Sequence, residues 1–151
     1  MRKINKKVLY LDIDGVLLGK RTPDNVEIVL ANYAKEFLEY CLRYYKCYWL
    51  TTHCRDGNQG PVINLFRKYA DNDVMNLIET IKPAPWNTLK TEAIDFKSDF
   101  YWIDDGLLQS EAELLHKNNC YNKWIKVDTR ANPDDLKRAM QTLRRKDNGS
   151  S

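Results

Sequence analysis

The chain has 151 residues, of which 43% are hydrophobic and 30% are charged, and its formal net charge at pH 7 is +3. This length suits one domain with its own core, so we predict a single domain over residues 1–151. The composition excludes a disordered, collagen-like or low-complexity chain. A membrane-spanning helix needs about 20 consecutive apolar residues, and no run of that kind occurs, so we expect no membrane-spanning segment.

The charge is unevenly distributed along the chain. Residues 1–7 and 136–151 each carry a net charge of +4, whereas residues 8–135 carry −5. We expect flexible basic ends over 1–7 and 144–151, and such ends favour a polyanion such as nucleic acid only weakly. The apolar stretch after the basic start ends at Asp12 with no small-residue cleavage site, which predicts a cytoplasmic protein.

The four cysteines show no C-x-x-C spacing, which predicts reduced thiols rather than disulfides or a zinc site. Cys41 and Cys47 are expected to be ordinary core residues.

Strands and helices are predicted to alternate along the chain. In order, we expect a strand over 7–13, a helix over 31–45, a strand over 47–51, a loop over 52–60, a helical stretch over 61–80, an extended segment over 81–85, a helix to about residue 94, a strand over 100–103, a helix over 111–117, a strand over 124–127 and a helix from 132 to about 145. Asn87 or Thr88 would cap the helix that ends near residue 94, and Pro133 would lie in the first turn of the last helix. This alternation predicts an α/β, Rossmann-like three-layer sandwich with a mainly parallel central sheet covered on both faces.

Polar side chains follow three of the four predicted strands. Asp12 and Asp14 end the first strand, Thr51 ends the second, and Asp104 with Asp105 ends the third. The carboxyl ends of parallel strands meet at one edge of the sheet, where ligands of open α/β sheets bind. Close carboxylates repel one another unless a cation or a proton lies between them, and carboxylate oxygens suit Mg²⁺. The sequence therefore predicts a magnesium site at this edge.

Four segments resemble the motifs of the haloacid dehalogenase-like (HAD-like) hydrolases, a superfamily that works through an aspartyl phosphate. LYLDIDGVL at residues 9–17 is similar to the first motif, an apolar strand followed by D-x-D-G-[TV]-L, and YWIDD at 101–105 is similar to the fourth. YWLT at 48–51 resembles the second motif, and Lys90 resembles the lysine of the third. The four motifs occur in family order; the first and fourth are the specific ones.

The resemblance implies a role for each catalytic residue. Asp12 would be the nucleophile that attacks phosphorus, and Asp14 would protonate the leaving oxygen and later accept a proton from water. Thr51 would donate its hydroxyl to a phosphoryl oxygen, and Lys90 would supply positive charge. The second aspartate favours phosphatases over dehalogenases, because a departing halide needs no proton.

The resemblance also implies a Mg²⁺ ion held by the Asp12 carboxylate, the Asp14 carbonyl and Asp104 or Asp105. Which of Asp104 and Asp105 contacts the metal directly stays open. A calcium loop is excluded, because its glycine belongs at the sixth position and here Gly15 stands fourth.

Several assignments have competitors. Thr52 could take the role of Thr51 if the strand ended one residue later, and Lys82 or Lys97 could take that of Lys90, which we prefer because Lys82 lies in a proline-constrained segment.

Residues flanking the second motif are also candidates. His53 and Arg55, together with Thr52, are candidate substrate-binding residues, although polar loop roles are the plainer interpretation for His53 and Arg55. The tryptophans are interpreted as core, except that Trp86 could border the cleft.

Only 38 residues separate Asp12 from Thr51, and 38 separate Thr51 from Lys90, so we expect no large cap domain. An open site favours a large phosphorylated substrate, and we favour a polynucleotide 3′-phosphate. The sequence thus predicts a Mg²⁺-dependent phosphohydrolase. A phosphatase of small metabolites or nucleotides is one alternative, and a catalytically silent module that binds nucleic acid or protein is the other. The oligomeric state stays open.

Overall fold

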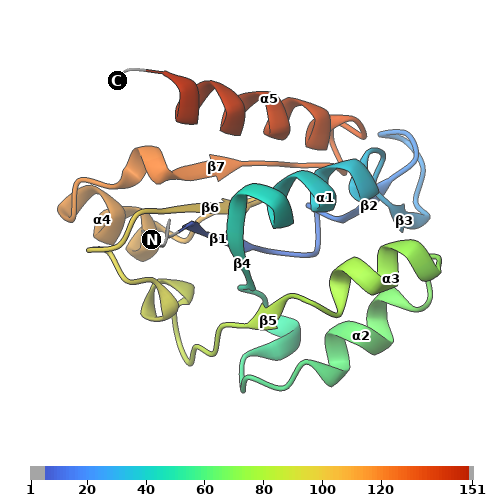
Figure 1. Cartoon of the computed structure of the whole chain (residues 1–151), viewed down its shortest axis with the longest axis horizontal. Helices are drawn as coiled ribbons and strands as arrows, with labels where there is room; N and C mark the ends of the chain where they lie inside the picture. The colour runs from blue at the N-terminus through green and yellow to red at the C-terminus, as the bar shows by residue number, and fades with distance from the viewer. Residues whose placement is uncertain (1–5, 150–151) are drawn as a thin grey trace, which may run out of the picture.

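The computed structural model describes residues 6–149, which form an α/β fold around a five-stranded parallel sheet (Figure 1). The strand order is β5-β4-β1-β6-β7. The bounds are β1 Lys7–Leu11, β4 Tyr45–Trp49, β5 Lys82–Pro83, β6 Phe100–Asp104 and β7 Trp124–Lys126. The predicted parallel sheet is confirmed, and β1 lies at its centre.

Both faces of the sheet are covered, as predicted. Leu9 and Leu11 of β1 pack into the core shared with the longer helices, whereas Tyr10 between them packs into a second core on the opposite face. The first core belongs to α1 Ala34–Tyr44, α2 Gly60–Phe66, α3 Asn72–Ile78 and α5 Asp135–Asn148, and the second to α4 Gln109–Lys117 with the 3₁₀ turn η2 Lys90–Ala93. A further 3₁₀ turn, η3 Tyr121–Lys123, has no buried residue. The central strands are therefore buried on both sides, which is why their sequences read as continuous apolar runs.

Three helix predictions need correction. The stretch 61–80 is two helices, because Asp71 accepts a hydrogen bond from the Val74 N–H at 3.0 Å and starts α3 as a separate element. The expected helix to residue 94 is only the short turn η2, and neither Asn87 nor Thr88 caps it. Instead, the Glu92 carboxylate accepts hydrogen bonds from the backbone N–H groups of residues 87–89.

The last helix begins at Asp135 rather than at Asn132, so Pro133 precedes it instead of lying in its first turn. Residues 144–148, expected to be flexible, continue α5, and Lys7 belongs to β1. The remaining residues of the expected flexible ends, except Lys6 and Gly149, lie outside the described residues.

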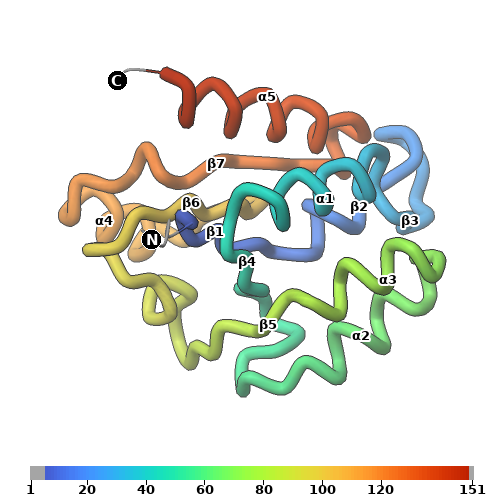
Figure 2. Tube along the Cα trace, viewed as in Figure 1, coloured from blue at the N-terminus to red at the C-terminus, as the bar shows by residue number. Residues whose placement is uncertain are grey.

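An antiparallel hairpin of β2 Leu18–Lys20 and β3 Ile28–Leu30 follows β1 and was not predicted. The trace in Figure 2 shows it beyond the end of β1, before the chain enters α1. The Lys20 N–H donates to the carbonyl of Thr129 at 3.3 Å, so the hairpin is attached to the loop after β7. It therefore lies at the edge of the sheet where the strands end.

A polar cluster ties α5 to the beginnings of three strands; we call it the Asp147 cluster (Lys7, Tyr45, Tyr101 and Asp147). The Asp147 carboxylate accepts hydrogen bonds from Lys7 Nζ at 2.9 Å, from Tyr101 Oη at 2.8 Å and from the Tyr45 hydroxyl. One ammonium and one carboxylate balance each other in it, and the two hydroxyls donate to the same carboxylate.

The four cysteines are buried and none forms a disulfide. Burial raises the pKa of all four thiols, to about 12 for Cys47 and to about 11 for Cys54. The expectation of unpaired thiols is thus confirmed, as is the core position of Cys41 and Cys47. No helix within residues 6–149 is long and apolar enough to cross a membrane.

Candidate active site

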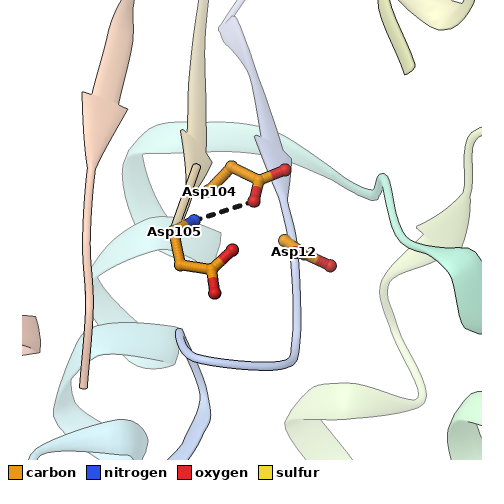
Figure 3. Close-up of side chains that lie close together, drawn as sticks. All are labelled: Asp12, Asp104 and Asp105. Carbon is orange, nitrogen blue, oxygen red and sulfur yellow. Dashed lines mark hydrogen bonds between the residues drawn. The ribbon is translucent and has the colours of Figure 1, made fainter. Parts of the chain in front are cut away.

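Three carboxylates meet where β1 and β6 end, as Figure 3 shows; we call them the carboxylate cluster (Asp12, Asp104 and Asp105). One oxygen atom from each lies within 4.8 Å of the other two. Asp12 and Asp104 are only 6% and 3% exposed, and the Asp104 carboxylate accepts the N–H of Asp105 at 2.8 Å. The predicted convergence of strand-end acids at one edge of the sheet is therefore present.

Lys90 supplies the positive charge nearest to this cluster. Its Nζ lies 3.1 Å from Asp12 Oδ2 and 2.7 Å from Asp104 Oδ2. The preferred assignment of Lys90 over the other two lysines agrees with this geometry. Lys82 and Lys97 are exposed, and in the described part of the chain neither forms an ion pair with Asp12 or Asp104.

The position of Lys90 depends on a buried glutamate that the sequence analysis did not single out. The Glu111 carboxylate accepts the backbone N–H of Lys90 at 3.0 Å and that of Leu108 at 3.0 Å. It therefore caps α4 and at the same time joins η2 to α4. A glutamate three residues after the position preceding a helix is a capping signal, but its second contact, with η2, comes only from tertiary packing.

The site holds more acidic than basic groups. Burial, and after it the charge of Asp12, raises the pKa of Asp104 to about 8, although Lys90 opposes this shift. Burial would lower the pKa of Lys90, but the charges of Asp12 and Asp104 outweigh it and raise that pKa. Lys90 is thus held as an ammonium between Asp12 and Asp104, and Asp105 adjoins them. The raised pKa of Asp104 shows that the acids are crowded, and a hard divalent cation among their oxygens would favour the ionised form.

Asp105 packs closely against the turn after β1. Gly15 has φ +75°, a left-handed conformation that favours glycine, and a Cβ atom there would overlap the Asp105 carboxylate. On its outer side Asp105 Oδ2 lies 3.7 Å from Arg130 Nη1. The D-G step of the first motif thus has a steric function, because only glycine leaves room for Asp105.

Asp14 does not join the carboxylate cluster through its side chain. Its Oδ2 lies 2.7 Å from His53 Nε2, and the side chain is 43% exposed. The sequence indicates His53 as a candidate substrate contact or a polar loop residue, and its pairing with Asp14 is visible only in the structure. The pairing depends on η1 (Thr52–Cys54), a short turn after β4 that no periodic pattern signals.

The two threonines after β4 lie in different environments. Thr51 is fully buried and its Oγ1 accepts the His53 N–H at 3.4 Å, whereas Thr52 is exposed and lines the cavity beside Asp12. Both candidates therefore stay open for the phosphate contact.

A cavity of about 390 Å³ lies over the carboxylate cluster. Asp12, Lys90 and Asp104 form its floor, and Trp86, Leu107 and Leu108 are among the apolar residues that line it. A larger cavity of about 660 Å³ lies along the start of β4 and is lined by lysines and tyrosines without a carboxylate. The candidate catalytic residues Asp12 and Lys90 thus line the smaller of these two cavities.

Arg55 lies outside this cavity. Its guanidinium stacks 4.4 Å from the ring centroid of Trp86 and donates to the carbonyl of Asn87. Trp86 in turn donates its Nε1–H to the Thr51 carbonyl at 3.0 Å. The expectation that Trp86 borders the cleft is confirmed, whereas Arg55 contacts Trp86 but is not among the lining residues.

No family model, curated protein or solved structure matches the chain. The resemblance of its four motifs to the HAD-like hydrolases therefore stays a prediction.

Proposed function

We propose that the chain is a magnesium-dependent phosphohydrolase that acts on a phosphomonoester through an aspartyl phosphate on Asp12. The observation that carries the proposal is the position of the Asp12 carboxylate. It borders a cavity, touches the Lys90 ammonium, and lies beside two further carboxylates. A nucleophilic carboxylate needs this combination of access and positive charge to approach a phosphate dianion.

In the proposed reaction an Asp12 oxygen forms a bond to phosphorus as the bond from phosphorus to the leaving oxygen breaks. Asp14 gives a proton to the leaving oxygen, which departs as an alcohol. Water then attacks the aspartyl phosphate, Asp14 takes a proton from that water, and inorganic phosphate leaves with Asp12 regenerated. General acid and base catalysis of this kind contributes about 10²- to 10⁴-fold.

Magnesium fits the donor set of the site. Asp12, Asp104 and Asp105 would hold it through carboxylate oxygens, and the family resemblance adds the Asp14 carbonyl. When bound, the ion would shield the negative charges of nucleophile and phosphate from each other. Lys90 holds the Asp12 carboxylate in place through its 3.1 Å contact and offers its charge to the same side of the cavity.

The segments between the motifs support an open site. Residues 13–50 hold the β2–β3 hairpin, α1 and β4, and residues 52–89 hold η1, α2, α3 and β5. Apart from the β2–β3 hairpin, which forms a sheet of its own, both segments consist of helices and strands of the α/β fold, which supports a site without a large cap. An open site favours a polynucleotide 3′-phosphate as substrate, with a small phosphorylated metabolite as the alternative.

The decisive experiment is hydrolysis of an aryl phosphate with and without Mg²⁺ by the parent chain, Asp12→Asn and the exposed control Asp24→Asn. We expect the parent and Asp24→Asn to be active only with Mg²⁺, and Asp12→Asn to lose at least about 10³-fold, because the nucleophile is gone. Equal rates for parent and Asp12→Asn would overturn the proposal and leave a binding module.

The substrate class is tested separately by comparing 3′-phosphorylated oligonucleotides with mononucleotides and sugar phosphates. We expect kcat/KM to rise with strand length. Indifference to strand length would favour the small-metabolite alternative.

A further inference from the structure

The hydrogen bond between His53 and Asp14 joins two segments 39 residues apart, one after β1 and one after β4. We infer that His53 is a positioning residue: it holds one oxygen of the Asp14 carboxyl so that the other faces the leaving group. This inference rests on the proposed phosphohydrolase function.

Hydrogen bonds other than the one between His53 and Asp14 hold the backbone of both segments in place. On one side, the Gly15 N–H donates to the Leu18 carbonyl at 2.8 Å, which closes the turn that follows Asp14. On the other side, the buried Thr51 accepts the His53 N–H, and its carbonyl accepts the Trp86 indole N–H. Side chains that project from such fixed positions lose little conformational freedom when they pair.

Stability alone accounts poorly for the pair. The His53 and Asp14 side chains are 30% and 43% exposed, and polar pairs of that exposure contribute little to the stability of a fold. The pair nevertheless has a short contact of 2.7 Å, and it lies two residues after Asp12 on one segment and two residues after Thr51 on the other. A contact that stabilises the fold so little at this location is better explained by what it orients.

The two oxygens of the Asp14 carboxylate have different roles in this inference. Within residues 6–149, His53 is the one side chain hydrogen-bonded to the Asp14 carboxylate, and it contacts Oδ2. When Nε2 donates its proton to Oδ2, Oδ1 is the oxygen that is free to carry the proton for the leaving group. As the phosphorus–oxygen bond of the substrate breaks, this proton moves from Oδ1 to the leaving oxygen, while His53 keeps its contact with Oδ2.

A leaving-group series tests this role. A dinitrophenolate departs without protonation, whereas an alkoxide does not, so only the alkyl phosphate depends on the Asp14 proton. Parent, His53→Ala, His53→Gln, His53→Asn and Asp14→Asn are assayed with both esters. His116→Gln is the matched control, because His116 lies on α4 and stacks on Tyr121 with ring centroids 4.1 Å apart.

We expect His53→Ala to lose at least about 10-fold in kcat/KM with the alkyl phosphate and less than about 3-fold with the dinitrophenyl phosphate, a fraction of the full contribution of a general acid. Gln places an N–H near the position of Nε2 and should restore more activity than Asn, which places one near Nδ1. Combining His53→Ala with Asp14→Asn should add no further loss.

Two results would overturn the inference: equal losses of His53→Ala on both esters, or losses that add to those of Asp14→Asn. Nitrogen NMR of the imidazole supplies a readout independent of turnover, because Asp14→Asn should shift the Nε2 signal of His53 and leave that of His116 in place. Failure of the proposed function is recognised separately, by full activity of Asp12→Asn.

Discussion

The same central strands carry a polar cluster at each end, and the two clusters are built differently. At the start of the strands, the Asp147 cluster pairs one ammonium with one carboxylate and adds two tyrosine hydroxyls that donate to that carboxylate. At their ends, the carboxylate cluster sets three acids around the single ammonium of Lys90. The first arrangement is electrically complete and holds α5 to the sheet. The second holds three acids against two basic groups, Lys90 between two of the acids and Arg130 beside the third, as expected of a site that takes up a cation with its substrate.

The largest expected effect comes from removing the ammonium of each cluster. Lys90→Met leaves Asp12 and Asp104 facing each other while buried, so we expect the free energy of unfolding without metal to fall by about 3–5 kcal/mol. Lys7→Met leaves Asp147 with two hydroxyl donors and partial exposure, so a loss of about 1 kcal/mol is expected. Urea denaturation measures both.

Magnesium sharpens this contrast. A bound ion stabilises the folded chain by about 2.7 kcal/mol at about 100 times its dissociation constant. At one fixed Mg²⁺ concentration Lys90→Met should gain more stability than the parent, because the ion replaces the lost ammonium between Asp12 and Asp104, whereas Lys7→Met should gain as much as the parent. An equal cost of the two substitutions would contradict the contrast between the clusters.

A smaller effect is expected at the turn that makes room for Asp105. Gly15→Ala should cost about 1–3 kcal/mol through its left-handed backbone. It should also weaken Mg²⁺ binding, because the new methyl group displaces the Asp105 carboxylate. Gly57→Ala is the matched control: Gly57 has φ +85°, and a Cβ there meets only Pro85, at 3.8 Å.

Calorimetric titration with Mg²⁺ should separate the two glycine variants. Unchanged affinity in Gly15→Ala would show that Asp105 does not contact the ion.

The smallest effect is a pH dependence of the Asp147 cluster. Burial would raise the pKa of Asp147, but hydrogen bonds from Lys7, Tyr45 and Tyr101 outweigh it and lower that pKa. In the unfolded chain the Asp147 carboxyl binds its proton with a pKa of about 3.9. The stability that the ionised Asp147 contributes to the fold is therefore complete above about pH 5 and is lost as pH falls through the lower pKa of the folded chain.

Asp147→Asn should therefore reduce the free energy of unfolding by about 1–2 kcal/mol at neutral pH. As pH falls from about 5 to about 3, the free energy of unfolding should decrease less in this variant than in the parent. Thermal unfolding across this range measures the slope, with the exposed Glu39→Gln as control. If stability falls with pH equally steeply in Asp147→Asn and in the parent, Asp147 does not contribute to the loss of stability in acid.

The parts of the fold that could be predicted are those set by burial. Leu9, Tyr10 and Leu11 form a continuous apolar run because both faces of β1 are covered, and acids after such a run must lie at the edge where parallel strands end. The meeting of Asp12 with Asp104 follows from these two facts. Lys90 could be preferred among the lysines by motif order and the proline constraint on Lys82.

The parts that could not be predicted depend on single contacts. The β2–β3 hairpin is short and partly exposed, with Ile28 45% accessible, so it has no apolar alternation to read. The break between α2 and α3 depends on the cap made by Asp71, and η2 on the Glu92 carboxylate. The His53–Asp14 pair depends on the direction in which a three-residue turn leaves β4, and no sequence period encodes that direction.

Because all four thiols are buried, the rate at which each cysteine reacts reports how often the structure around it opens. A thiol reagent reaches a buried cysteine only when the chain around it opens, and local openings cost less free energy than complete unfolding. Cys41 sits in the middle of α1, whereas Cys54 ends the turn that carries His53. The alkylation rates of the two cysteines, measured in one sample, would therefore compare local opening of the η1 turn with opening of the core around α1.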